Sequence, residues 1–204
     1  MRQEKNMNKY ASIEDIEGYL VINIDEGQYN QVNAWLEAVS RKMDTVANRV
    51  LVAPAIGSGE DYEEKYYDGN NKGFISIDDC QEIIKIQEGD SYGDNLVDIE
   101  SSNFITYPRK SPFRRIIRKS GAFIKGMQNV RVEGRFGFFD EVPGDLRFAC
   151  SVIVAGIITN YNKGPQSVTS ERYVDYQVNY DSDKGWADYQ EAIATVESYR
   201  KIDF

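Results

Sequence analysis

The acidic side chains are the first residues in the chain that could do chemistry. Asp78 and Asp79 are adjacent, as are Asp140 and Glu141, and each pair falls where a strand or turn is expected to end. Two carboxylates can hydrolyse a bond if they are held at the right separation and their pKa values are pushed apart. Adjacent acidic residues in turns are mostly solvated caps, so we expect these pairs to be structural and the protein not to be an enzyme.

The side chains that many enzymes use as a base or as a metal ligand are missing or poorly placed. The chain has no histidine, which excludes histidine general bases, the Ser-His-Asp and Cys-His arrangements, and most zinc or non-haem iron sites. Its two cysteines, Cys80 and Cys150, fit no metal-binding spacing. Both lie beside apolar residues, so we expect buried, reduced thiols, which suit a cytosolic assembly environment.

Three short segments resemble binding loops only in part. Residues 181–185, Asp-Ser-Asp-Lys-Gly, are similar to the start of a calcium loop, which needs a Glu at its twelfth position. The twelfth residue counted from Asp181 is Ala192. Residues 57–60 lack the lysine of a Walker loop, and residues 133–139 lack the Gly-x-Gly-x-x-Gly spacing of a dinucleotide site. We therefore expect neither a metal ion nor a cofactor.

The uneven distribution of charge is the strongest functional signal. The net charge is −9, yet the stretch between Glu100 and Glu133 has no acidic residue and eight basic ones, namely Arg109, Lys110, Arg114, Arg115, Arg118, Lys119, Lys125 and Arg131. Such a segment could neutralise DNA phosphates without reading sequence, meet an acidic patch on a partner protein, or protect exposed strands as solvated charges. The residues themselves leave these three interpretations open.

The elements that would position these residues follow from the apolar periodicity. Residues 12–20, 29–48 and 143–160, and the segment from Trp186 to Tyr199, have apolar residues at helical spacing. The helix over 143–160 is apolar nearly all round, which predicts that it is the central, most buried one. Residues 62–138 instead hold short apolar runs separated by turn signals, which is typical of strands. A further alternation predicts a strand at 173–180.

This order predicts an α+β fold that is mainly a helical bundle, with two N-terminal and two C-terminal helices and an inserted small β-sheet or β-hairpin region. Residues 1–60 would supply the N-terminal helices, residues 61–140 the β-rich insertion, and residues 141–204 the C-terminal helices and strand, all in a single structural domain. The longest apolar run, residues 150–158, is too short to span a bilayer, so we expect no membrane association.

The stretch over residues 129–150 leads from the best predicted strand into the buried helix. Gly134 and Gly137 stand among aromatic residues, where they could let the strand bulge or let another backbone approach closely. Pro143 suits the first helical turn, and Asp145 follows it. We interpret these four residues as a structural junction that holds the β region at a set angle to the bundle.

Four places in the sequence together resemble phage head–tail connector proteins, also called adaptor or head-completion proteins, which form a ring beneath the portal. They are the two N-terminal helices in "YASIEDIEGYLVI" and "QVNAWLEAVSRKMDTVANRV", the turn and strand in "YYDGNNKGFISI", the junction "VEGRFGFFDEVPGDLRFAC", and the C-terminal strand and helix in "TSERYVDYQVNY" and "VESYRK". The stretch from Glu88 to Gly126 is expanded relative to that family.

The resemblance implies a structural virion protein without enzymatic activity, located in the neck at the head–tail interface and assembled in the host cytoplasm. Its expected partners are further copies of itself in a ring of twelve, the portal protein on one side, and a stopper or tail protein on the other. Double-stranded DNA would pass through the lumen without sequence-specific contacts. The alternative function from the residues is a DNA-binding module that uses segment 109–131.

The DNA-binding alternative makes a direct prediction. If segment 109–131 binds phosphates, affinity for duplex DNA will fall steeply as salt is raised, because released counterions drive such binding. Replacing Arg114, Arg115 and Arg118 with Ala is then expected to abolish binding in a fluorescence-anisotropy titration. An absence of measurable binding by the unmodified protein at low salt contradicts this alternative.

Overall fold

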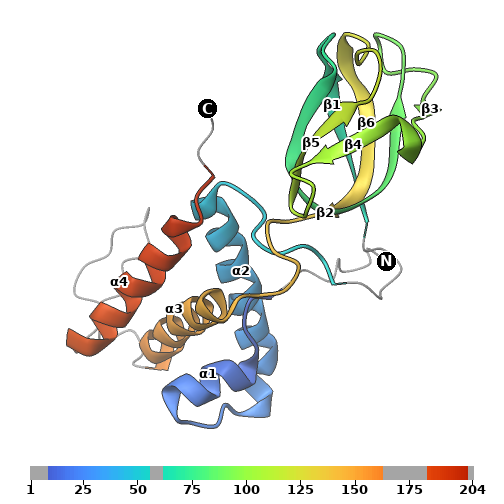
Figure 1. The fold of residues 1–204 in the computed structure, drawn as a ribbon. Coiled ribbons are helices and arrows are strands. Elements are labelled where there is room, and N and C mark those ends of the chain that lie inside the picture. The colour runs from blue at the N-terminus through green and yellow to red at the C-terminus, as the bar shows by residue number, and fades with distance from the viewer. Residues whose placement is uncertain (1–8, 56–61, 163–182, 202–204) are drawn as a thin grey trace. The chain divides into compact units, whose positions relative to one another are not determined.

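The computed structural model describes residues 9–55, 62–162 and 183–201. The chain divides into two compact units, and Figure 1 labels their elements. The helical unit comprises Met1–Asn48 and Val142–Phe204, and the β unit comprises Arg49–Glu141. The predicted strand at 173–180 lies outside the described residues. Of the helices that the structure describes, none is long and apolar enough to cross a membrane.

The helical unit is built from four α-helices and one short 3-10 helix among the described residues. They are α1 (Ile13–Leu20), η1 (Glu26–Gln28), α2 (Tyr29–Ala47), α3 (Gly144–Asn162) and α4 (Asp183–Ser198). The predicted helices at 12–20, 29–48, 143–160 and the C-terminal segment are confirmed.

Local signals explain where the first two helices begin and end. The Ser12 hydroxyl accepts the backbone N–H of Asp15 at 3.2 Å, and the Asp15 carboxylate accepts the backbone N–H of Ser12 at 2.8 Å. This reciprocal capping box satisfies two N–H groups that have no partner within the helix. At the other end of the pair, α2 stops at Asn48, which adopts a left-handed φ of 52° that asparagine tolerates better than most residues.

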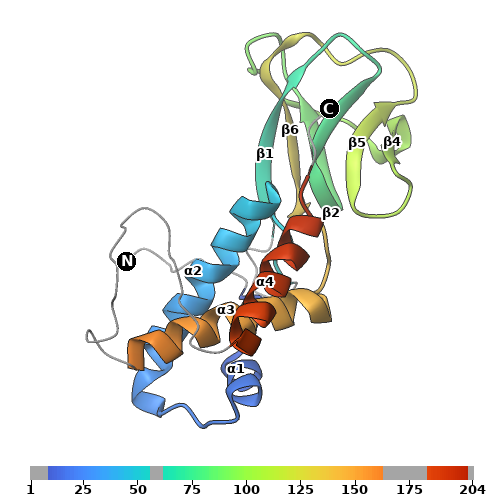
Figure 2. The ribbon, with the colours of Figure 1, turned by 90° about the vertical axis from the view of Figure 1, so that its left-hand side faces the viewer.

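Helix α3 lies at the centre of the helical unit. It packs against α1, α2 and α4, and the two views in Figures 1 and 2 show it with these helices around it. Because it has neighbours on several sides, apolar residues around most of its circumference are buried, among them Leu146, Ala149, Cys150, Val152, Val154 and Ala155. The prediction that this helix is the central one is confirmed.

Tyrosine hydroxyls tie the last helix to the rest of the helical unit. Tyr19 donates to Asp188 on α4 at 2.9 Å, and Tyr199, just after α4, donates to Asp145 on α3 at 2.6 Å. Partial burial and the Asp188 carboxylate raise the pKa of Tyr19 to about 12. The hydrogen bond to Asp145 and partial burial raise the pKa of Tyr199 to about 12. Both phenols therefore stay protonated donors well above neutral pH.

In the described residues, the β unit is one antiparallel sheet of six strands. They are β1 (Glu63–Gly69), β2 (Phe74–Glu88), β3 (Val97–Asp98), β4 (Phe104–Tyr107), β5 (Phe113–Arg118) and β6 (Gly126–Phe136). The hydrogen-bonded order is β1-β6-β2-β5-β4, with β3 paired to β2 off this path. A 3-10 turn, η2 (Ser101–Asn103), precedes β4.

Strand β2 pairs with two different strands, β5 and β6, along its length. Its first part pairs with β5, from Phe74 opposite Ile117 to Cys80 opposite Phe113, and its second part pairs with β6, from Cys80 opposite Phe136 to Glu88 opposite Val130. The pairing register shifts on both sides of Cys80, and such irregularities bend and twist a strand. The sheet thereby surrounds a core of its own, formed by Ile75, Ile77, Cys80, Ile86, Ile116, Phe123, Val130, Val132 and Phe136.

The expectation of a mainly helical fold with a small β insertion is wrong in its emphasis. The fold is α+β, but the described strands are comparable in extent to the helices. The reason is that the sheet buries its own apolar cluster and is stabilised by it, rather than depending on the helices for a core.

Candidate functional site

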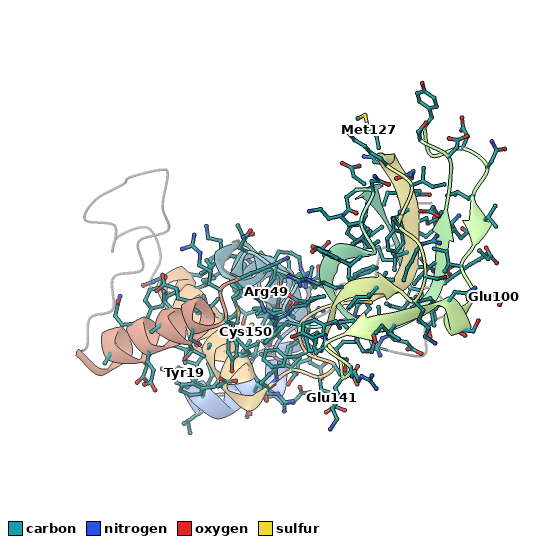
Figure 3. All side chains as sticks on the ribbon, turned by 45° about the horizontal axis from the view of Figure 1, so that its top comes forward. Tyr19, Arg49, Glu100, Met127, Glu141 and Cys150 are labelled. Atoms are coloured by element: carbon teal, nitrogen blue, oxygen red, sulfur yellow. The ribbon has the colours of Figure 1, made fainter. Side chains whose placement is uncertain are left out.

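The structure distributes the predicted basic residues along the whole sheet. Arg109 and Lys110 lie in the exposed loop between β4 and β5. The register places Arg114 near Cys80, whereas Lys119 and Lys125 follow β5 at the opposite end, where Gly126 pairs with Gly69. Met127, labelled in Figure 3, marks this opposite end. The segment is therefore not one continuous positive patch.

Several of these cations are paired within the β unit. Arg114 bonds to Asp79, Arg118 to Glu88, and Arg131 to Glu64. Arg115 lies over the Phe74 ring, 5.4 Å from its centroid. Arg109, Lys110, Lys119 and Lys125 are exposed and have no ion pair with any described residue.

Asp79 on β2 is a buried carboxylate that contacts Arg49, the first residue of the β unit. Asp79 is 4% exposed and accepts a hydrogen bond from Arg114 Nε at 3.0 Å, while Arg49 Nη1 lies 3.5 Å from its other oxygen. The two guanidinium groups also lie over the Phe138 ring, at 4.4 Å for Arg49 and 5.7 Å for Arg114. We call these four residues the Asp79 clamp. Both charge pairing and cation–π contact hold its members together.

The clamp lies beside the two segments that enter and leave the β unit. Phe138 donates its backbone N–H to Val50 at 3.0 Å, Phe139 donates to Leu51 at 2.8 Å, and Ala53 donates to Phe139 at 2.9 Å. Residues 50–53 and 137–139, which we call the connector pair, thus form a short parallel bridge. Figure 3 labels Arg49 and Glu141, the first and last residues of the unit.

Two polar side chains fasten the connector pair to the sheet. The Gln81 amide donates to the carbonyls of Gly137 at 3.2 Å and Phe138 at 2.7 Å. Arg135, which is 4% exposed, donates to the Pro54 carbonyl at 2.9 Å and to Asp140 at 2.7 Å. These bonds satisfy backbone carbonyls that no strand partner reaches, so the connectors have a fixed conformation.

The two predicted junction glycines each admit a neighbouring backbone. A Cβ at Gly137 would lie 2.2 Å from the Ala53 nitrogen, and a Cβ at Gly134 would lie 2.3 Å from the Glu82 carbonyl oxygen. Neither distance is sterically possible for a real side chain, so both positions require glycine. The Gly137 N–H also donates to the Asp79 carbonyl at 2.8 Å.

Comparison with known proteins identifies the fold. No protein-family model matches the sequence, and no curated protein matches it significantly. Solved structures do match: a chain from the neck of an empty GTA particle, computed with C6 symmetry, has a TM-score of 0.60 and 11% identity over 97% of this chain and 96% of that one. The fold is shared with chains of gene transfer agent particles.

Two further matches are of the same kind. A chain of the virion of a native gene transfer agent (GTA) particle has a TM-score of 0.57, and a chain from the neck of the native GTA particle, computed with C12 symmetry, has 0.56. Each is 10% identical and covers 98% of this chain and 97% of its own. The likeness to the GTA chains therefore extends over both units.

The other two predicted junction residues lie in the helical unit of this GTA-like fold. Pro143 directly precedes α3, and its carbonyl accepts the first helical N–H, from Arg147, at 3.0 Å. Asp145 bonds to Tyr199. The shared role of Gly134, Gly137, Pro143 and Asp145 as a junction stays a prediction.

In the GTA-like fold, three residues of the predicted acidic pairs form ion pairs, and both cysteines are buried. Asp78 pairs with Lys65, Asp79 belongs to the clamp, and Asp140 bonds to Arg135. In the described part of the chain, no cluster of three or more acidic or cysteine residues could hold a metal ion. Cys80 and Cys150 are buried and unpaired, and burial raises the pKa of each thiol to about 12. Their predicted burial as free thiols is confirmed.

Sequence reasoning named Asp79 only as a catalytic candidate and did not single out Arg49, Gln81 or Arg135. The partners of Asp79 come from the start of the unit and from β5, so the clamp has no local sequence signature. The available signal was the alternation along β2, which places Asp79 on the same face as Ile75 and Ile77, because a charge buried on an apolar face needs a partner of opposite sign.

The clamp predicts a selective loss of stability. Asp79→Ala leaves two guanidinium groups without their carboxylate, one of them on a largely buried Arg49, and is expected to cost about 3 kcal/mol of unfolding free energy. Asp78→Ala is the matched control, because Asp78 is half exposed and paired with one lysine, and is expected to cost less than about 1 kcal/mol. Urea denaturation measures both. Equal effects of the two substitutions contradict the clamp.

The close approach at Gly137 predicts a defect in assembly. Gly137→Val would push the connector pair apart and is expected to reduce oligomer formation, measured by light scattering, while the helical content in circular dichroism remains. Gly18→Val is the control, because nothing lies within 4 Å of a Cβ built at that exposed position. Normal oligomers from the Gly137 variant contradict the junction interpretation.

Proposed function

We propose that this chain is a structural protein of a virion neck, a head–tail connector that forms an adaptor ring beneath the portal. The observation that carries the proposal is the match to GTA neck chains over nearly the whole length of both proteins, with a TM-score of 0.60 for the neck of the empty particle. The match includes the helical unit and the β unit, and it agrees with the resemblance seen in the sequence.

The proposed partners follow from that role. Further copies of the chain form a ring, for which we propose twelve copies, because a twelve-fold ring is compatible with both the C6 and the C12 symmetry of the matched neck structures. The ring docks on the portal, receives a stopper or tail protein on its other side, and encloses double-stranded DNA. Assembly in the host cytoplasm before incorporation into the virion completes the proposal.

The composition supports a passive role around DNA. The chain carries a net charge of −9, and a predominantly acidic protein repels the phosphate backbone, so DNA can slide through the lumen without adhering. The alternative of a dedicated DNA-binding module gains no support from the geometry. Arg114 and Arg118 are already paired with carboxylates, and the remaining cations lie at different ends of the sheet.

The connector proposal is tested by assembly with portal. Purified chain is mixed with the portal protein of the same virus, and the products are examined by light scattering and negative-stain electron microscopy. We expect rings of the chain bound coaxially to portal rings, because heterologous contacts between identical subunits generate a ring when the rotation between neighbours closes. A chain that stays monomeric and unbound in this mixture contradicts the proposed function.

A further inference from the structure

The loop of residues 107–112, between β4 and β5, presents positive charge that no described residue neutralises. Arg109 and Lys110 are exposed and form no ion pair with any residue in the described part of the chain. Tyr107 beside them is 57% exposed. The two prolines of the loop fix φ, so it has little conformational freedom to lose when it docks. We call residues 107–112 the basic loop.

The turn that joins α1 to α2 carries the opposite charge. No basic residue occurs between Lys9 and Arg41, whereas that stretch contains six acidic residues. Figure 1 shows the two helices that this turn connects. Together with two exposed apolar residues, the acidic residues at the turn form a surface that we call the acidic corner: Glu14, Glu17, Val21, Ile22, Asp25 and Glu26.

The four carboxylates of the acidic corner gather around one phenol. Partial desolvation and the charges of Glu17, Glu26, Glu14 and Asp25 together raise the pKa of Tyr29. Glu17 accepts the Ile24 N–H at 2.7 Å, which folds the turn back onto α1. Within the described residues, none of the four carboxylates forms an ion pair. Their negative charge therefore faces solvent without a cation.

The apolar part of the acidic corner is held in an unfavourable conformation. Val21, at which α1 ends, is 88% exposed and left-handed, with φ 56° and ψ 42°. A β-branched side chain is disfavoured in this region, and helices commonly end there on glycine or asparagine. Ile22 beside it is 46% exposed. A strained, exposed apolar side chain of this kind points to a contact with another protein.

We propose that the basic loop of one copy docks on the acidic corner of the next copy. This inference rests on the proposed ring function and names the two surfaces that join neighbouring subunits. In this contact, Arg109 and Lys110 face the carboxylates of the corner, and Tyr107 packs against Val21 and Ile22. Each copy has one surface of each kind, so the contact is heterologous, and such contacts generate a ring when the rotation between neighbours closes.

The charges favour a second copy as the occupant of both surfaces. A basic loop and an acidic corner are complementary, whereas two loops bring cations together and two corners bring carboxylates together. Like charges brought together across an interface are unfavourable. Both surfaces also combine charge with exposed apolar side chains, so one contact covers Tyr107, Val21 and Ile22 as well.

Charge reversal tests the contact. The corner variant carries Glu14→Lys, Asp25→Lys and Glu26→Lys, so that three lysines face only Glu17. The loop variant carries Arg109→Glu and Lys110→Glu. Each variant alone is expected to lose rings with portal at least tenfold, because its two surfaces then carry the same sign. Rings are measured by light scattering and counted in negative stain.

Matched controls make the same charge changes outside both surfaces. Glu63→Lys, Glu191→Lys and Glu197→Lys are the control for the corner variant, and Lys42→Glu with Lys119→Glu is the control for the loop variant. All five side chains are exposed. Both controls are expected to form rings normally. Losses in the controls equal to those in the variants would show an effect of net charge alone and contradict the proposal.

Mixing the two variants distinguishes a second copy from any other occupant. The corner variant has two basic surfaces and the loop variant has two acidic ones, so equal amounts are expected to alternate and restore rings. A single chain with all five substitutions is also expected to form rings by itself. If the portal, a tail protein or DNA covers these surfaces instead, the mixture does not recover rings.

Val21→Gly separates a contact from a role in folding. Glycine adopts the left-handed conformation without strain, so the variant is expected to melt at a higher temperature by about 2–4 °C in circular dichroism. Its yield of rings is nevertheless expected to fall several-fold, because the apolar contact with Tyr107 is lost. A variant that is stabilised and forms rings normally contradicts a role for Val21 in the contact.

Folding of every variant is checked by circular dichroism before assembly. If the corner variant is unfolded, Glu14→Lys with Glu26→Lys replaces it, because this pair keeps the hydrogen bond from the Gly27 N–H to Asp25. Normal rings from a folded variant of either surface, or no recovery on mixing, would overturn the contact while leaving the connector function intact. Failure of the unmodified chain to form rings with portal would instead contradict the proposed function itself.

Discussion

The β unit depends on the neutralisation of one buried carboxylate. Asp79 lies on β2 beside Cys80, where the strand changes partners from β5 to β6. A charge at such a position is unfavourable without compensation. Arg49 and Arg114 supply it from two other segments, and Phe138 packs against both guanidinium groups. The start of the unit, β2, β5 and the end of β6 are thereby held at one point.

The connector pair is held by a second set of contacts beside the Asp79 clamp. Backbone segments outside a sheet normally leave their carbonyls to water, but those of residues 137 and 138 accept from Gln81. Gly137 lets Ala53 approach, and Arg135 bonds to the Pro54 carbonyl. Each of these contacts joins segments that are distant in the sequence. The sequence alone therefore does not show why a glycine or a polar side chain is required at these positions.

The helices and several strands could be predicted from the sequence because their signals are local. Ser12 and Asp15 cap α1 within four residues, and the apolar face of α2 repeats every three or four residues. The extent of the sheet could not be predicted in this way, because its core joins Ile75, Ile116 and Val130 from distant segments. The basic segment was visible as composition, but its division between the two ends of the sheet follows from the strand register. The pairing of Asp79 with Arg49 and Arg114 is likewise a consequence of the fold and not of spacing.

The connector pair has a consequence for how such proteins can diversify. Because residues 50–53 and 137–139 run side by side, the β unit begins and ends at nearly the same place, as domains inserted into a host fold commonly do. An inserted segment whose two ends are adjacent can become longer or shorter, or be replaced, while α3 still begins at the same position. The sheet can then change in extent while the helical unit keeps its own packing.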